Sequence, residues 1–268
     1  RWCLIAHPEA GPDGRVARCL VDGSPLVAVA LSPLPRAAIA ELVGTLELPA
    51  PLRRRPDLVD SLARHAGGHH FFTLETLKAL ILDGVSAGDA LPVPAAARTR
   101  IDRRIAGVSR TARDLLALLA LADPPLPLTV CAAALDVSLA QLAGAWRELD
   151  TVQLTQGEAI AHDLVRESVL ATLPPPARRA LHLALARQLD AHGGVPPHRL
   201  AEHWSGAHAW PQALDAWRSA ARQARMAGRL EACEALMARA LSAAEQGADE
   251  DAAFEARCQM LTARLLRQ

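Results

Sequence analysis

The chain has 268 residues, of which 51% are hydrophobic and 22% are charged, and its 29 Lys and Arg residues balance its 29 Asp and Glu residues. This length predicts two or three small domains, and the neutral charge argues against direct nucleic-acid binding by this segment. The longest apolar run, Leu115–Ala122, is too short to cross a membrane, so no membrane partner is expected. Five dispersed cysteines without a Cys-x-x-Cys pair are typical of reduced thiols in the cytoplasm, which is the expected location.

The segment 1–48 is predicted to form two buried strands and a helix. Trp2–Ala6 and Pro25–Leu31 are continuous apolar runs, as in a parallel sheet that is covered on both faces. Arg36–Val43 has the periodicity of an amphipathic helix. Because two strands do not make a stable sheet alone, we expect the C-terminal remnant of an α/β domain and a chain that is part of a longer protein.

The segment 49–94 is predicted to contain two helices and a linker. Asp57 is expected to cap the first helix, which the pair Gly67-Gly68 ends. The second helix, Phe71–Leu82, is apolar on most faces and is expected to be buried. The stretch 84–94 is rich in Gly and Pro and is predicted to be a linker.

The segment 95–175 has the pattern of a winged-helix domain. Ser109 is predicted to cap an apolar helix, and Ser138 with Gln141 forms a capping box that opens another. Gly157 is placed at the turn of a small hairpin. The predicted elements are helices at Arg98–Ala106, Ala112–Ala122, Val130–Leu135 and 138–149, strands at Val152–Thr155 and 159–162, and a helix at Asp163–Leu173.

The segment 176–268 is predicted to be helical throughout and to begin a helical-repeat array. Apolar residues recur at helical spacing in helices of roughly 12–16 residues, with small residues at the expected contacts. The predicted apolar stripes are Leu181, Ala184, Leu185 and Leu189; Leu214, Trp217 and Ala221; Leu230, Cys233, Met237 and Leu241; and Phe254, Cys258, Leu261 and Leu265. The last of these helices is expected to have no partner within the chain.

The junction of the hairpin with the following helix contains the pair His162-Asp163. A polar side chain at a helix N-terminus is well placed to meet an anion, and an imidazole can donate a hydrogen bond to a phosphate oxygen. The alternative is structural, with His162 bridging the hairpin to the helix and Asp163 acting as the N-cap. Both interpretations of His162 remain open at this point.

Two motifs and the C-terminal helices together resemble the signal-transduction ATPases with numerous domains (STAND), an AAA-like class. Ala66-Gly67-Gly68-His69-His70-Phe71-Phe72-Thr73-Leu74-Glu75-Thr76-Leu77 is similar to the Gly-Asn-Pro-Phe-Phe-Leu-x-Glu-Leu segment of that family. Ala161-His162-Asp163-Leu164-Val165-Arg166-Glu167-Ser168-Val169 resembles its His-Asp-Leu-Val-Arg-Glu-Ala signature, and the tail resembles its degenerate tetratricopeptide-like helices. The resemblance is closest to bacterial transcriptional regulators of the MalT/LuxR-like and SARP-associated kind and covers nearly the whole chain.

The resemblance implies a mainly α architecture of four parts. These are the remnant of the nucleotide-binding domain (1–48), a helical lid and linker (49–94), a winged helix (95–175) and tetratricopeptide-like repeats (176–268). In such ATPases the histidine of the winged helix reaches the phosphates of bound ADP and holds the inactive state.

The matching position in this chain is His162, and the resemblance adds Gly67, Gly68 and His70 as nucleotide-sensing residues. The segment 66–77, the lid motif, departs from the family at two positions, since His69 replaces Asn and His70 replaces Pro. The sequence contains no Gly-x-x-x-x-Gly-Lys-Ser/Thr loop, so ATP or ADP is expected to be bound by the full-length parent and not by this segment alone. No catalytic residue and no metal site are predicted.

Three functions remain as alternatives. The first is a regulatory segment that relays nucleotide state, through other domains of the same chain, to an array that meets an inducer or protein partner. The second is a helical-repeat interaction scaffold without nucleotide control, for which Trp204, Trp210 and Trp217 form either core or a partner-binding groove. The third is a DNA reader, which is disfavoured because the predicted recognition helix offers only Arg147 as a basic side chain.

Overall fold

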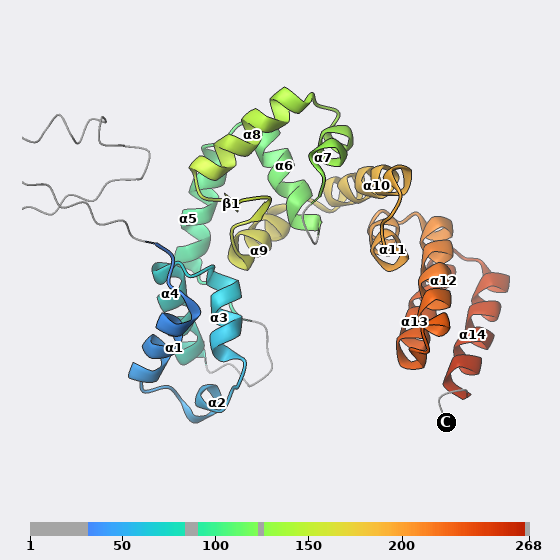
Figure 1. The fold of residues 1–268 in the computed structure, drawn as a ribbon, viewed down its shortest axis with the longest axis horizontal. Coiled ribbons are helices and arrows are strands. Elements are labelled where there is room, and N and C mark those ends of the chain that lie inside the picture. Colours follow the sequence, from blue (N-terminus) through green and yellow to red (C-terminus); the bar gives the residue numbers. More distant parts are fainter. Residues whose placement is uncertain (1–31, 84–90, 123–125, 266–268) are drawn as a thin grey trace, which may run out of the picture. The chain divides into compact units, whose positions relative to one another are not determined.

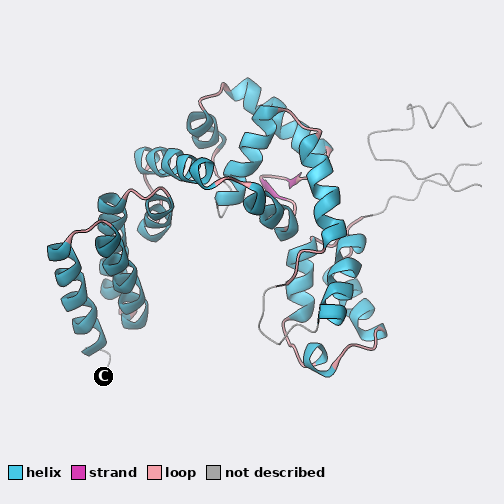
Figure 2. Cartoon of the chain, turned by 180° about the vertical axis from the view of Figure 1, so that it is seen from behind, coloured by secondary structure: helices cyan, strands magenta, loops and turns pink. Residues whose placement is uncertain are grey.

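The computed structural model describes residues 32–83, 91–122 and 126–265, and these contain 14 helices and two short strands (Figures 1 and 2). The mainly α prediction is confirmed for this part of the chain, whereas the strands predicted at Trp2–Ala6 and Pro25–Leu31 lie outside it. The elements are α1 Arg36–Thr45, α2 Ala50–Arg53, α3 Leu58–Ala66, α4 His70–Asp83, α5 Ala95–Ala106, α6 Arg110–Leu121, α7 Leu128–Leu135, α8 Leu139–Thr151, β1 Thr155–Gln156, β2 Ala159–Ile160, α9 Asp163–Thr172, α10 Pro175–His192, α11 Pro197–Gly206, α12 Trp210–Met226, α13 Leu230–Gln246 and α14 Glu250–Leu265.

The chain divides into two compact units. Among the described residues, the first comprises those up to Arg100 together with the short segments Thr151–Gln153 and His162–Leu164, and the second comprises the others. Within the described ranges, no single helix combines the length and apolarity needed to cross a membrane, and α7 and α8 do so only when taken together across a 105° bend.

The first unit packs α1 to α4 around an aliphatic core. α4 contributes Phe72, Leu77 and Leu80 to the buried set, but its Leu74, Ile81 and Leu82 are exposed. The prediction that this helix is buried on most faces was therefore wrong, because its neighbours cover only one side. The main cluster consists of Ile39, Leu48, Leu52, Leu58, Leu62, Leu77, Leu80 and Leu91.

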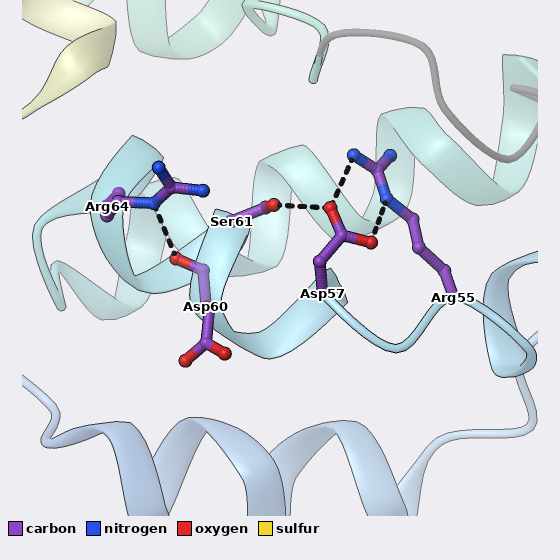
Figure 3. A network of polar contacts seen from close by, with 5 residues as sticks. All are labelled: Arg55, Asp57, Asp60, Ser61 and Arg64. Atoms are coloured by element: carbon purple, nitrogen blue, oxygen red, sulfur yellow. Dashed lines mark hydrogen bonds and ion pairs between the residues drawn. The ribbon is translucent and has the colours of Figure 1, made fainter. Parts of the chain in front are cut away.

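The start of α3 differs from its prediction in one detail. Asp57 occupies the N-cap position, but its side chain accepts no hydrogen bond from the helix backbone. Instead it accepts two from the Arg55 guanidinium, at 3.1 and 3.2 Å, and one from the Ser61 hydroxyl at 3.0 Å (Figure 3). A charged guanidinium is a stronger donor than a neutral peptide N–H, and it lowers the pKa of Asp57. The predicted end of α3 is confirmed, with Gly67 in the left-handed conformation at φ 56°.

The two predicted serine caps in the second unit are confirmed. Ser109 accepts a hydrogen bond from the Ala112 N–H at 3.2 Å, and Ser138 exchanges bonds with Gln141 as a capping box requires. One partner was not predicted. The Glu148 carboxylate, from α8, accepts from the Ser109 backbone N–H at 2.8 Å and from its hydroxyl at 2.6 Å, which lowers the pKa of Glu148.

The predicted hairpin is present but shorter. Thr155 pairs with Ile160 and Gln156 with Ala159 in an antiparallel ladder, and Gly157 begins the turn at φ 62°. The chain leaves α8 through a turn in which Gln153 has φ 56°, so the strand expected from Val152 starts three residues later.

The helices of the C-terminal array, α10 to α14, are joined from α11 onward by three turns with the same backbone geometry. His208, Gly228 and Ala248 each have positive φ (59°, 71° and 55°) and recur at steps of 20 residues. After each of them the next N–H bonds the carbonyl five residues back: Ala209 to Trp204, Arg229 to Ala224, and Asp249 to Ala244, at 2.9 to 3.0 Å. This is the Schellman pattern of helix ends, and within the array it recurs at the same spacing in all three turns.

Replacing Ala248 with glycine is expected to stabilise the array by about 0.5–1 kcal/mol. An L-residue at positive φ is strained, and glycine relieves the strain at the cost of some chain entropy. The matched change is Gly228→Ala at the equivalent turn, where an added Cβ would meet no atom within 4 Å. It is expected to cost about 1 kcal/mol through the backbone alone. Urea unfolding followed by tryptophan fluorescence measures both, and a lower midpoint for Ala248→Gly would contradict the turn geometry.

The apolar stripe predicted on α14 does not pack on the array. Phe254 is 67% exposed and Leu265 is 69% exposed, and Cys258 and Leu261 also face solvent. The face of α14 that packs on the array carries Ala253, Ala256 and Ala263 instead. Alanines allow close approach of the neighbouring helix, so in this repeat packing selects the small residues and leaves the large apolar ones outside.

Candidate functional site

His162 is placed by the end of the hairpin, where the chain returns to the first unit. It is 9% exposed and lies directly before α9. α9 begins at Asp163, so the position before the helix belongs to His162, and Asp163 lies in the first turn instead of acting as the predicted N-cap. The His162 ring meets the Phe72 ring edge-on, with centroids 5.0 Å apart and planes at 62°. Phe72 is 1% exposed, so this contact is buried within the first unit.

The lid motif forms the turn between α3 and the start of α4, and its rings lie together. His69 lies 4.3 Å from Phe72 and is stacked on His70 at 5.2 Å between centroids. Phe71 meets Phe72 at 5.7 Å and carries the Arg100 guanidinium 4.7 Å from its ring centroid. His70 is exposed, whereas His69 and Phe71 are half-buried. The motif therefore presents a continuous set of aromatic rings, one of which contacts His162.

Gly68 has a packing role that the sequence did not reveal. It has φ 73°, and its carbonyl accepts a hydrogen bond of 2.8 Å from the Leu34 N–H. A Cβ at this position would lie 2.6 Å from the Leu34 carbonyl oxygen and 3.0 Å from its nitrogen. The backbone at Leu34 therefore occupies the space that a side chain would need, and only glycine fits.

A second buried histidine lies near this site. The His65 Nε2 atom is 3.1 Å from the Pro92 carbonyl oxygen, and the residue is buried. Burial lowers the pKa of His65, although the Pro92 carbonyl and the charge of Asp163 oppose the shift. The imidazole is therefore neutral near pH 7. His65 was not predicted from the sequence, because its partner lies 27 residues away and no local pattern links the two.

The chemistry available here is hydrogen bonding and ring stacking by imidazole and phenyl side chains. In the described ranges no three His, Cys, Asp or Glu side chains are grouped so that they could hold a metal ion. The structure places His162 against Phe72, which belongs to the same short segment as the other predicted sensing residues, Gly67, Gly68 and His70.

The three tryptophans of the array are part of its packing. Trp204 and Trp217 are buried, and the Trp217 Nε1–H donates to the Ser205 hydroxyl at 3.0 Å. Trp210 is half-buried against the same cluster and stacks on His208 at 5.1 Å. Trp204 and Trp217 are thus enclosed by their own helices, whereas Trp210 remains partly exposed.

Comparison of the chain with known protein families, with curated proteins and with solved structures finds no significant match. The functional argument therefore rests on the motifs and on the geometry that unites them.

Proposed function

We propose that this chain is the regulatory and coupling segment of a STAND-type ATP-binding signal-transduction protein, of the kind found among bacterial transcriptional regulators. One observation carries the proposal. Phe72 and His162 belong to the two motifs that resemble the family, lie about 90 residues apart in the sequence, and are in ring contact within one unit. Two motifs that sense a single nucleotide have to lie close together, and the Phe72–His162 contact meets this requirement.

In the proposed mechanism the nucleotide is held mainly by residues outside this chain, and His162 donates a hydrogen bond to a phosphate oxygen of ADP. A change in the position of His162 can be transmitted to the second unit by α9. α9 begins at Asp163 in the first unit, and from Val165 the same helix belongs to the second. A helix transmits a shift at its end along its whole length, so it couples the sensing histidine to the array.

The finer architecture is part of the proposal. We assign α6 to α9 with the β1–β2 hairpin to a winged helix, and α10 to α14 to tetratricopeptide-like repeats. Support for the first comes from the hairpin between α8 and α9, whose turn carbonyl at Gly157 accepts from the Trp146 indole at 3.0 Å. Support for the second comes from the three identical turns at 20-residue steps.

A helical-repeat scaffold without nucleotide control is the second candidate, and the repeated turns favour it equally. The scaffold function does not require the Phe72–His162 contact, so this contact distinguishes the two candidate functions. A DNA-reading role for α8 is disfavoured further, because Arg147 is joined on the same helix by Glu148, whose carboxylate is engaged in capping α6.

The test is ADP retention by the protein encoded in the complete open reading frame. His162→Ala is expected to weaken ADP binding about 10-fold or more, the usual loss for one hydrogen bond to a charged group, and to raise basal activity. His192→Ala, at an exposed histidine ending α10, is the matched control and is expected to change neither.

Because His162 is buried, the Ala variant is compared with Phe72→Leu, which removes the ring contact and keeps the apolar volume. Both variants are checked for folding by circular dichroism. Unchanged ADP affinity in folded His162→Ala and Phe72→Leu proteins would reject nucleotide sensing and leave the scaffold.

A further inference from the structure

A groove of about 540 Å³ runs between α12 and α14 in the C-terminal array. Its floor is apolar and is formed by three helices. These contribute Ala221 from α12, Cys233 and Met237 from α13, and Ala263 from α14. The three helices lie side by side in both views of the ribbon (Figures 1 and 2). A concave site of this size, with an apolar floor and a few polar groups at its edge, has the form of a small-ligand pocket.

One wall of the groove is cationic. Arg218, Arg222 and Arg225 occupy successive turns of one face of α12, and all three line the groove. Arg218 is fixed to the opposite wall, where it donates to the Glu255 carboxylate at 2.7 Å and to the Ala252 carbonyl at 3.3 Å. Its Nε atom is buried and has no hydrogen-bond acceptor among the described residues.

Arg222 and Arg225 are the available charges of this wall. Both are exposed, and neither forms an ion pair with the described part of the chain. The charge of Arg225 reaches the floor, since it opposes the rise that burial causes in the pKa of Cys233. The acidic residues of the groove are Glu255, which is engaged by Arg218, and Asp215 at the start of the same wall. Across from the arginines lie Gln259 and Thr262, which are neutral.

We propose that this groove binds a small organic anion, a carboxylate or phosphate carried on an apolar body. Guanidinium groups bind carboxylates and phosphates through paired N–H donors, and Arg222 and Arg225 are placed to do so at the mouth. The apolar floor then accepts the body of the ligand and removes it from water. This proposal gives the chemical class of the inducer in the proposed function. It rests on that function only for the effect of ligand binding, and not for the binding itself.

Calorimetric titration of the chain tests the site with defined probes. Octanoate and phenyl phosphate are expected to bind, whereas acetate, which lacks an apolar body, and octyltrimethylammonium, which has the opposite charge, are expected to bind at least 10-fold more weakly. The double variant Arg222→Gln, Arg225→Gln is expected to lower octanoate affinity at least 10-fold. Arg187→Gln, on the exposed face of α10, is the control and is expected to leave it unchanged.

Equal binding of octanoate by the double variant and the wild type would overturn the proposal, as would equal binding of octyltrimethylammonium and octanoate. Both arginines are exposed, so folding of the variant is expected and is verified by its unfolding midpoint. The titration needs no nucleotide and is repeated in His162→Ala. Unchanged ADP affinity in His162→Ala together with octanoate binding rejects only the proposed function. Weakened ADP binding in His162→Ala without any octanoate binding rejects only the groove.

Discussion

Replacing Gly68 with alanine is expected to destabilise the first unit by about 3 kcal/mol or more, enough to unfold a marginally stable unit. Two costs combine. Left-handed backbone at φ 73° is unfavourable for alanine by about 1–2 kcal/mol. The new Cβ would also lie 2.6 Å from the Leu34 carbonyl oxygen, and backbone cannot rotate away as a side chain can, so the Leu34–Gly68 hydrogen bond has to break. Thermal unfolding and limited proteolysis of the first unit measure the effect.

The matched control is Gly44→Ala, in α1 of the same unit. An added Cβ there meets no atom within 4 Å, and alanine is favoured over glycine inside a helix by about 1 kcal/mol. We therefore expect Gly44→Ala to be neutral or stabilising. If Gly68→Ala unfolds at the same temperature as the wild type, the close approach of Leu34 to the lid motif is incorrect, and the packing explanation of Gly68 fails with it.

Acidification is expected to destabilise the array through a buried histidine pair. His182 of α10 and His203 of α11 share a hydrogen bond of 3.1 Å between their Nδ1 atoms, in which one imidazole donates and the other accepts. His203 is 5% exposed. Burial, together with electrostatic repulsion from His182 and Arg199 of a proton on its ring, lowers its pKa from 6.5 to about 4. Burial and Arg178 lower the pKa of His182 in the same direction.

The sign of the effect follows from proton uptake. Between pH 6.5 and 4 the unfolded chain binds a proton at His203 that the folded chain does not, so folding free energy is lost as the pH falls. The stabilisation is complete above about pH 6.5, and about 3 kcal/mol of it is gone near pH 4. Urea midpoints measured from pH 8 to pH 4.5 follow this loss.

Two variants isolate the contribution of His203. His203→Gln keeps a polar partner for His182 and removes the titrating ring, so its stability is expected to vary less over the same pH range. His192→Gln changes an exposed histidine at the end of α10 and is expected to behave as the wild type. All three proteins contain the same carboxylates, so a difference between their pH profiles is expected to come from the histidine that was replaced. Equal pH slopes for wild type and His203→Gln would show that the pair is not buried as described.

Features that depend on neighbouring residues were predictable from the sequence. The caps at Ser109 and Ser138, the end of α3 at Gly67 and the turn at Gly157 all involve atoms within a few residues of one another. Their hydrogen bonds form once the local backbone is set, so residue type and spacing are sufficient. The helical content of the array followed in the same way from its apolar periodicity.

Features that depend on which surfaces meet were not predictable. The apolar stripe on α14 identified large side chains, but the packed face is made of alanines, because the distance between helices decides which residues fit. His203 pairs with His182 of another helix, 21 residues away, and no local pattern connects the two. Glu148 reaches Ser109 across 39 residues, and no spacing rule connects them.

The candidate site combines both kinds of information. The sequence alone identified the lid motif and the His162-Asp163 junction, since each is a short run of residue types with its own local chemistry. Only the tertiary structure showed that Phe72 and His162 are in contact and that Leu34 leaves no room for a side chain at Gly68. A contact between distant segments is selected by packing of the whole unit, in which every neighbour competes for the same space, and that competition is not encoded in any one stretch of the chain.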